Sequence, residues 1–510
     1  MNIKKIISLL LTTLLIWNFN LIPSEARTIT SEQSRSITPY LEQVKKNITE
    51  FTLENNLKFI VLENHQAPII SFVTYVDVGA VDEPDGQTGV AHYLEHLAFK
   101  GTSEIGTVNY EEEKPLLEKL SILFDQIQIA RKENNQEKLT QLEAEFAQIN
   151  QQASELVQQN EFGQIVEIEG GVGLNAATSA DYTAYFYNFP ANKLELWMYL
   201  ESNRFLDPVF REFYEEKEVI LEERRMRTDN SPIGKMVEEF LDTAFVSHPY
   251  RRPVIGYEQD IRNLTTKNVD DFFETHYGGG NITIVMVGDV DPNQVKSMAQ
   301  DYFGRFPKTV KPSPATVNEP PQTETREVVV KYPSQPIYFE GYHIPDLNNP
   351  DYVVYDIMGS VLSDGRTSRL YKSLVEEEKV ALSAAGFTGF PGNKYLNLML
   401  FYAISAPGRS LDELATELDK EIEKLKTELV TQEELERVKT QATARLLRSV
   451  NSNSGMANLL AEYEAKTGDW RNLFTRLDAI NAVRAQDIQR LARKTFTDQQ
   501  KTIGKLETIQ

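Results

Sequence analysis

The chain of 510 residues contains no cysteine. Disulfide bonds, iron–sulfur clusters, cysteine-ligated zinc and a cysteine nucleophile are therefore excluded. Basic residues are outnumbered by acidic ones, 53 against 75, which gives a net charge of −22. Because binding to a nucleic-acid backbone needs a basic face, this charge argues against nucleic acid as a partner. A metal bound by the protein must be held by histidine, aspartate or glutamate, and there are only six histidines.

Long apolar runs are also missing, except near the N-terminus. There, two lysines precede an apolar run, 6–16, which is shorter than the roughly 20 residues that a bilayer span requires. Small residues at Ser24 and Ala26 fit a cleavage site, so residues 1–26 are predicted to be a signal peptide that is removed after Ala26. We therefore expect a periplasmic or secreted protein whose mature chain has no membrane span. An uncleaved anchor is the alternative, and the lack of arginine before position 27 disfavours a mitochondrial presequence.

Short β-rich runs alternate with helical patterns in two halves of the chain. The segment 306–325 is rich in proline and threonine and poor in large apolar residues, which is typical of a linker. We expect an N-terminal domain over 45–305 and, where the pattern restarts, a similar domain over 326–510. The predicted fold class is α+β, with two similar α/β-sandwich domains in which helices pack on a sheet rich in antiparallel pairs.

The segment 111–169 differs from the rest of the first half because it is acidic and its apolar residues follow a coiled-coil spacing. Apolar residues recur at steps of three and four on both sides of Asn134-Asn135. This pattern predicts an antiparallel helical hairpin inserted into the first domain. The sequence leaves open whether the hairpin is a solvated spacer or an arm that binds a partner.

The motif His92-Tyr93-Leu94-Glu95-His96 carries the clearest chemistry. On a helix, residues i and i+4 lie on one face, so both imidazoles can bind the same ion. Two neutral imidazoles favour zinc, and the neighbouring Glu95 can accept a proton from water. The order is HxxEH, the inverse of the commoner zinc-protease motif. The alternative is a surface helix with an accidental pair of histidines.

A catalytic zinc site needs a third protein ligand and an open position. The other four histidines are isolated in the sequence, so the acidic run 215–225 is the better source. Within it, Glu216 and Glu223 are seven residues apart, which places both on one face of a helix. Taken alone, such a run would be interpreted as a solvated helix face. Sites with two histidines and one glutamate also accept manganese or cobalt, so the pattern does not fix the metal.

The segment HYLEHLAFKGT at 92–102, followed by EKEVILEERRMR at 216–227, resembles the pitrilysin/insulinase family of zinc peptidases, and most closely its mitochondrial-processing-peptidase-like branch. Segments 170–190, 248–256, 281–292 and 364–374 also look like family segments, in the family's order. The gap from the histidine motif to the second acidic motif is longer than is usual in the family, which the predicted hairpin explains.

The resemblance implies a role for each matching residue. His92, His96 and Glu223 would bind one zinc ion, Glu95 would act as the general base, and Glu216 would orient a ligand from behind.

The resemblance also implies how substrate and partner are arranged. Asn175 and Ala176 match the edge strand on which the family lays its peptide substrate. Two domains of this type form one half of a clam-shell, which closes by pairing with a second half. Active members carry an arginine and, seven residues later, a tyrosine that reach across to the substrate. The matching positions here are Glu376 and Ser383, so the pair is absent. We therefore expect a homologous partner subunit that carries the pair, or a homodimer.

The predicted function is a zinc metalloendopeptidase that cleaves unfolded peptides inside a closed chamber. The alternative is a non-catalytic peptide-binding or assembly subunit of the same fold. A third hypothesis, an acidic coiled-coil scaffold, rests on the hairpin segment alone.

Overall fold

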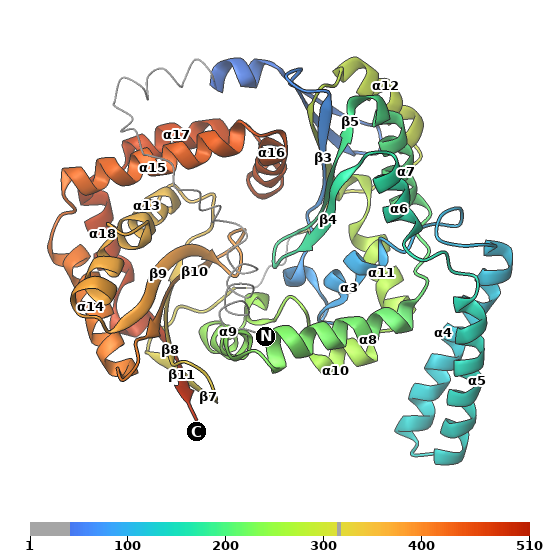
Figure 1. The fold of residues 1–510 in the computed structure, drawn as a ribbon, viewed down its shortest axis with the longest axis horizontal. Helices are drawn as coiled ribbons and strands as arrows, with labels where there is room; N and C mark the ends of the chain where they lie inside the picture. Colours follow the sequence, from blue (N-terminus) through green and yellow to red (C-terminus); the bar gives the residue numbers. More distant parts are fainter. Residues whose placement is uncertain (1–40, 314–317, 510) are drawn as a thin grey trace.

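A computed structural model describes residues 41–313 and 318–509. The predicted signal peptide, residues 1–26, lies outside this part of the chain. Two β-sheets, one in each half of the sequence, stand opposite each other with helices around and between them (Figure 1). Within the described ranges, none of the helices combines the length and the apolar character needed to cross a membrane.

The first sheet has six strands in the order β1-β2-β6-β3-β5-β4. Strands β2 and β6 are parallel, and every other pair is antiparallel. The strands are β1 (Ile48–Thr52), β2 (Lys58–Glu63), β3 (Ile69–Val76), β4 (Val172–Thr178), β5 (Thr183–Pro190) and β6 (Ile282–Gly288). A tight turn joins β1 to β2 as a hairpin, and Asn56 adopts the left-handed conformation there, with φ 74°.

The second sheet repeats the connectivity of the first, except that β1 has no counterpart. Its order is β7-β11-β8-β10-β9, which matches β2-β6-β3-β5-β4, and its parallel pair β7/β11 corresponds to β2/β6. The strands are β7 (Arg326–Tyr332), β8 (Ile337–Ile344), β9 (Ala381–Phe390), β10 (Asn397–Ser405) and β11 (Lys501–Thr508). The prediction of two similar α/β sandwiches is therefore confirmed, and β9 is the edge-strand counterpart of β4.

The helices of the two halves cover these sheets. Those of the first half include α3 (Val90–Leu97), α4 (Tyr110–Lys132), α5 (Gln136–Ser154), α6 (Glu161–Ile168), α7 (Leu194–Leu206), α8 (Phe213–Arg224), the π-helical turn η3 (Arg225–Asp229), α9 (Pro232–Ala244), α10 (Glu258–Asn263), α11 (Thr266–His276) and α12 (Pro292–Phe303). Those of the second half are α13 (Tyr352–Ser363), the π-helical segment η6 (Tyr371–Glu377), α14 (Leu411–Thr427), α15 (Gln432–Val450), α16 (Asn453–Thr467), α17 (Asn472–Ala482) and α18 (Ala485–Thr495).

Each sheet is covered on one face by a helix that comes from the other half of the sequence. Helix α16 lies against β3 and β6 of the first sheet, and α9 lies against β7 and β11 of the second (Figure 1). The residues that meet in the first contact include Val73, Val285, Val287, Met456 and Leu460. Those that meet in the second include Met236, Phe240, Phe339, Leu398 and Leu506. The halves are thus interlocked.

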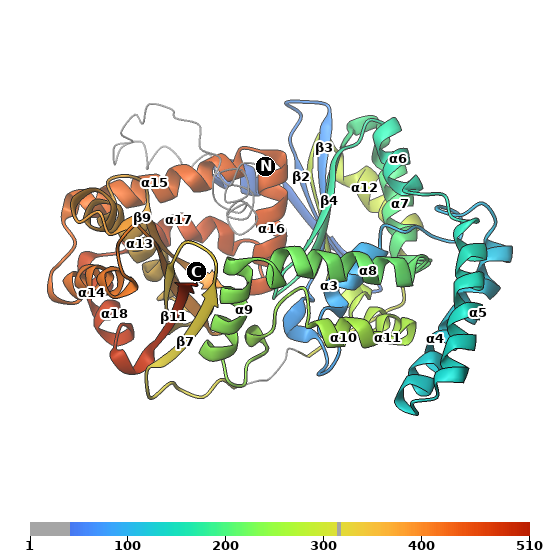
Figure 2. The ribbon, with the colours of Figure 1, turned by 60° about the horizontal axis from the view of Figure 1, so that its bottom comes forward.

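Helices α4 and α5 form the predicted antiparallel hairpin, which projects from one end of the molecule (Figure 2). Its predicted apolar seam is buried between the two helices. Glu113, near the start of α4, pairs with Arg211 at 2.9 Å, and both side chains are fully buried. Helix α6 instead packs Phe162 and Val166 into the core of the first domain, so the hairpin proper comprises α4 and α5.

Candidate metal centre

The histidine motif lies on α3, whose start is fixed by its surroundings. Gly89 precedes the helix with φ 90°, and a Cβ there would come within 2.7 Å of a backbone carbonyl oxygen, so glycine is required. The Glu83 carboxylate accepts hydrogen bonds from the backbone N–H groups of Gly89 and Ala91, 3.0 Å each. Leu94 and Leu97 are buried in the core and fix the rotation of the helix. The remaining face presents the motif.

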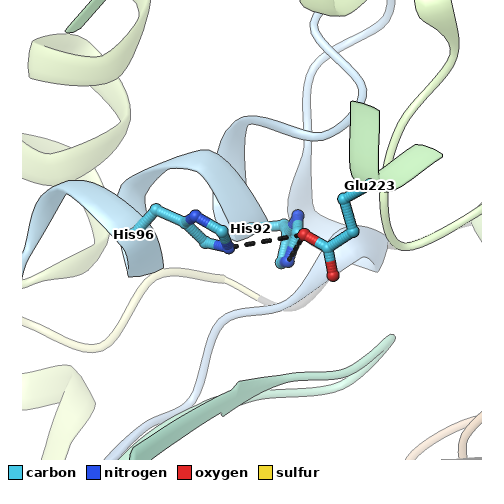
Figure 3. A group of neighbouring side chains, drawn as sticks. All are labelled: His92, His96 and Glu223. Atoms are coloured by element: carbon cyan, nitrogen blue, oxygen red, sulfur yellow. Dashed lines mark ion pairs between the residues drawn. The ribbon is translucent and has the colours of Figure 1, made fainter. Parts of the chain in front are cut away.

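His92, His96 and Glu223 come together between α3 and α8 (Figure 3). Oε2 of Glu223 lies 3.8 Å from Nε2 of His92 and 3.7 Å from Nε2 of His96. The three ligand atoms all lie within 4.8 Å of one another. Two ligands about 2.1 Å from a tetrahedral zinc ion are separated by about 3.4 Å, whereas a direct hydrogen bond would be near 2.9 Å. The side chains therefore fit an ion held among them.

The protonation states also suit metal binding. Nδ1 of His96 lies 2.8 Å from Oε1 of Glu216. A carboxylate can only accept, so Nδ1 carries the proton and Nε2 presents its lone pair to the centre. Lys100 lies 2.6 Å from the other oxygen of Glu216 and 3.1 Å from Glu212. Burial lowers the pKa of His92 to about 3, which keeps that imidazole neutral.

Opposing effects act on the pKa of Glu216 and on the pKa of His96, which Glu216 contacts. Burial alone would raise the pKa of Glu216, but its hydrogen bonds to His96 and Lys100 lower the pKa to about 2. Burial alone would lower the pKa of His96, but the hydrogen bond and charge of Glu216 raise it. The carboxylate of Glu216 therefore stays ionised and holds the imidazole in one orientation.

Glu95 lies beside the ligands and is tied to the neighbouring strand. Oε2 of Glu95 accepts a hydrogen bond of 2.5 Å from Oγ1 of Thr178, the last residue of β4. Burial raises the pKa of Glu95, against the opposing effect of Thr178. A carboxylate with a raised pKa is suited to exchanging a proton with a reactant near neutral pH.

Asn175 and Ala176 lie on β4, next to this centre. Strand β4 is the outer strand of the sheet, and within the described residues its backbone pairs with β5 alone, which leaves its other edge unpaired there. The backbone N–H of Ala176 donates to the side-chain oxygen of its neighbour Asn175 at 2.9 Å. The strand with the two predicted substrate-contact residues therefore presents a free edge beside Glu95.

Other predicted positions lie elsewhere. Glu376 is exposed on η6, and Ser383 lies on β9 of the second sheet. None of the remaining four histidines belongs to the group of three ligands found among the described residues.

Sequence reasoning missed three partners of the centre: Thr178, Lys100 and Arg227. Arg227 lies 2.9 Å from Oε1 of Glu223. Its i,i+4 spacing from Glu223 could have revealed that pair, whereas no local pattern indicates Thr178.

Two family models match the chain. The model described as insulinase (peptidase family M16) matches residues 58–120 and 148–258, and the model described as peptidase M16 inactive domain matches residues 263–442. The first match leaves out residues 121–147, which form most of the hairpin.

Similar proteins cover nearly the whole chain. The zinc protease PqqE of Helicobacter pylori is 30% identical over 465 residues, covering 88% of this chain and 90% of that protein. An uncharacterized zinc protease of Bacillus subtilis, YmxG, is 21% identical over 459 residues, covering 88% and 96%. Among solved structures, a protease from Helicobacter pylori superposes with a TM-score of 0.76 at 28% identity, covering 90% of this chain and 99% of that one. The first half of the periplasmic protease PqqL from Escherichia coli gives a TM-score of 0.65 at 15% identity, covering 91% and 92%.

Proposed function

The chain belongs to the insulinase family of zinc peptidases, family M16, and from this premise we propose that it is a zinc-dependent endopeptidase. His92, His96 and Glu223 hold the metal, and Glu95 is the catalytic base. The observation that carries the proposal is the position of Glu223: one carboxylate oxygen lies 3.7 and 3.8 Å from two imidazole nitrogens. These separations are too long for hydrogen bonds and close to those of ligands that share an ion.

The chemistry divides between the metal and the protein. When bound, zinc supplies a Lewis acid that polarises the scissile carbonyl and makes water a better nucleophile. Glu95 accepts the proton of the attacking water and later delivers it to the leaving amine. Thr178 fixes the Glu95 carboxylate through its hydrogen bond of 2.5 Å, and Glu216 holds His96 in the orientation that binds metal.

The substrate is an unfolded peptide that adds as a further strand to the free edge of β4. Backbone pairing along Asn175 and Ala176 would bring the peptide past Glu95, because Thr178 at the end of the same strand touches that carboxylate. A folded domain cannot offer an extended strand of this kind, so the requirement for an edge selects unfolded chains.

The active unit closes a chamber by pairing with a second subunit. Glu376 and Ser383 occupy the positions where active relatives are expected to carry arginine and tyrosine, and a carboxylate there would repel a developing oxyanion. A homologous partner that carries the pair would complete the site, and a homodimer is the other arrangement. Assaying the purified chain with and without candidate partners tests this. Full activity of the lone chain or its homodimer would show that a partner carrying the pair is not needed.

Glu95→Gln tests the catalytic proposal. The glutamine keeps the size and the hydrogen bond to Thr178 but cannot accept the proton, so we expect turnover of an unstructured peptide to fall by about 10²–10⁴-fold. Zinc content, measured by elemental analysis, should remain near one ion per chain. Unchanged turnover by the zinc-loaded variant would rule out the proposed mechanism.

The alternative is a non-catalytic peptide-binding subunit of the same fold. The absence of the arginine and tyrosine favours it. In that case the wild-type protein would bind peptides and zinc without turnover in any partner combination.

We extend the proposal to the location of the protein and to the division of its chain into domains. The signal-peptide pattern over 1–26 supports a periplasmic or secreted protein. We divide the mature chain into a zinc-binding domain over 45–305, a linker over 306–325 and a second domain over 326–510.

A further inference from the structure

Arg227 is a cation beside the metal centre that the proposed mechanism does not use. It lies on η3, the π-helical turn that continues α8 beyond Glu223. Its NH1 is 2.9 Å from Oε1 of Glu223, while Oε2 of the same carboxylate faces His92 and His96. Glu223 therefore stands between the imidazole pair and the guanidinium, and Arg227 lies directly next to the atoms that would hold the ion.

The side chain of Arg227 is accessible to solvent, whereas Lys100 and Arg224 are held by carboxylates and are less exposed. The Arg227 side chain is 58% exposed. Lys100 is held by two carboxylates behind the centre. Arg224 is buried and forms two hydrogen bonds with the carboxylate of Glu238. Only one N–H of Arg227 is needed for Glu223, so its remaining donors can bind a second group.

The charge balance at the centre favours an anion as that second group. With the metal in place, the negative charge of Glu223 is directed to the ion, and its hold on Arg227 weakens. Within residues 41–313 and 318–509, the carboxylate that forms an ion pair with Arg227 is that of Glu223. Elsewhere the chain is strongly acidic, with a net charge of −22. Arg227 is therefore a local positive site that can attract an acidic group, although the chain as a whole is negatively charged.

We propose that Arg227 is a specificity-determining residue that binds a carboxylate of the peptide next to the scissile bond. Guanidinium groups recognise carboxylates through paired, charge-assisted hydrogen bonds. The carboxylate can belong to an aspartate or glutamate side chain, or to the C-terminus of a short substrate. The proposal rests on the peptidase function proposed above.

The test compares peptides that differ only in this carboxylate. The first pair of unstructured peptides carries Glu or Gln beside the cleaved bond, and both have an amidated C-terminus. The second pair carries Gln at that position, with either a free or an amidated C-terminus. We expect the wild type to favour the carboxylate by about fivefold in kcat/KM, the effect of one partly exposed ion pair. Arg227→Ala should abolish the preference and Arg227→Lys should keep part of it. The peptide pair that shows the effect identifies the source of the carboxylate.

Arg225→Ala is the matched control. Arg225 lies on the same turn, is 54% exposed and pairs with Glu222, away from the ligands. The control should retain the preference. No preference in the wild type, an unchanged preference in Arg227→Ala, or an equal loss in Arg225→Ala would each overturn the proposal.

Two measurements distinguish a role of Arg227 in recognising the substrate from a role in holding Glu223 in place. Zinc affinity, measured by competition with a chelator, should be nearly equal in wild type and Arg227→Ala. Peptide binding to the Glu95→Gln variant, followed by fluorescence anisotropy, should show the same carboxylate preference without turnover, and Arg227→Ala should remove it there as well. If Arg227→Ala changes only zinc affinity, Arg227 is not a specificity residue. If Glu95→Gln abolishes turnover but no carboxylate preference exists, this proposal fails and the peptidase function stands. If Glu95→Gln leaves turnover intact, the peptidase mechanism fails.

Discussion

Replacing Glu216 should weaken zinc binding although Glu216 is not one of the three proposed ligands. Its carboxylate joins Nδ1 of His96, at 2.8 Å, to Nζ of Lys100, at 2.6 Å. A hydrogen bond to a charged group contributes about 1.5–3 kcal/mol, and removing such a partner of a metal-binding histidine costs about 10–100-fold in metal affinity. These ranges agree, because each factor of ten is about 1.4 kcal/mol. Glu216→Ala should lie near 100-fold.

Glu216→Gln should lie near tenfold. Its amide oxygen can still accept from His96, but its NH₂ would face the ammonium group of Lys100, which would turn to Glu212, 3.1 Å away. Titrating metal-free protein with zinc against a coloured chelator measures both variants. Glu222→Gln is the control, since Glu222 lies on the same helix, is 52% exposed and pairs with Arg225. If both Glu216 variants bind zinc within twofold of the wild type, Glu216 does not orient His96 as argued.

Two further predictions concern buried charged residues, Glu113 near the start of α4 and Lys217 on α8. Glu113→Ala leaves the fully buried Arg211 without its carboxylate and should lower the free energy of unfolding by about 3–5 kcal/mol. We expect a lower melting temperature and faster proteolysis of the hairpin. An unchanged melting temperature would contradict this. Burial lowers the pKa of Lys217 from 10.5 to about 7. Between these two pH values the folded state therefore binds fewer protons than the unfolded state, so the free energy of unfolding should rise with pH from about 7 to 10.5. Lys217→Met should remove this rise in urea unfolding at pH 7 and pH 9.5, and identical slopes in both proteins would refute the assignment.

The sequence predicts the grouping of His92, His96 and Glu223 because these residues come from two helices with local periodicity. His92 and His96 share a face by their i,i+4 spacing, and Glu216 and Glu223 share one by their spacing of seven. That the two helices lie next to each other depends on residues far apart in the sequence, and this part of the prediction came from the family resemblance. The hairpin was likewise visible in its heptad spacing. The acidic run was ambiguous alone, since a solvated helix face has the same pattern.

Contacts between distant segments could not be predicted in this way. Thr178 meets Glu95 because β4 and α3 pack side by side, and neither residue lies in a pattern that indicates the other. The apolar faces of α9 and α16 predict burial but do not tell which sheet each helix covers. The parallel pairing of β2 with β6 joins segments more than 200 residues apart, and its register is set by the finished sheet.

The interlocking of the two halves has a consequence for dissection of the chain. The segment between α12 and β7 is not what keeps the halves together, because α16 and α9 are each held by the opposite sheet. A protease nick there should leave a complex of two fragments that co-migrate until denatured. Either fragment made alone would expose the sheet face that its missing helix covers, including Val73 and Val285 in the first half, and would aggregate. The smallest unit of this protein that can be produced by itself therefore spans both sheets.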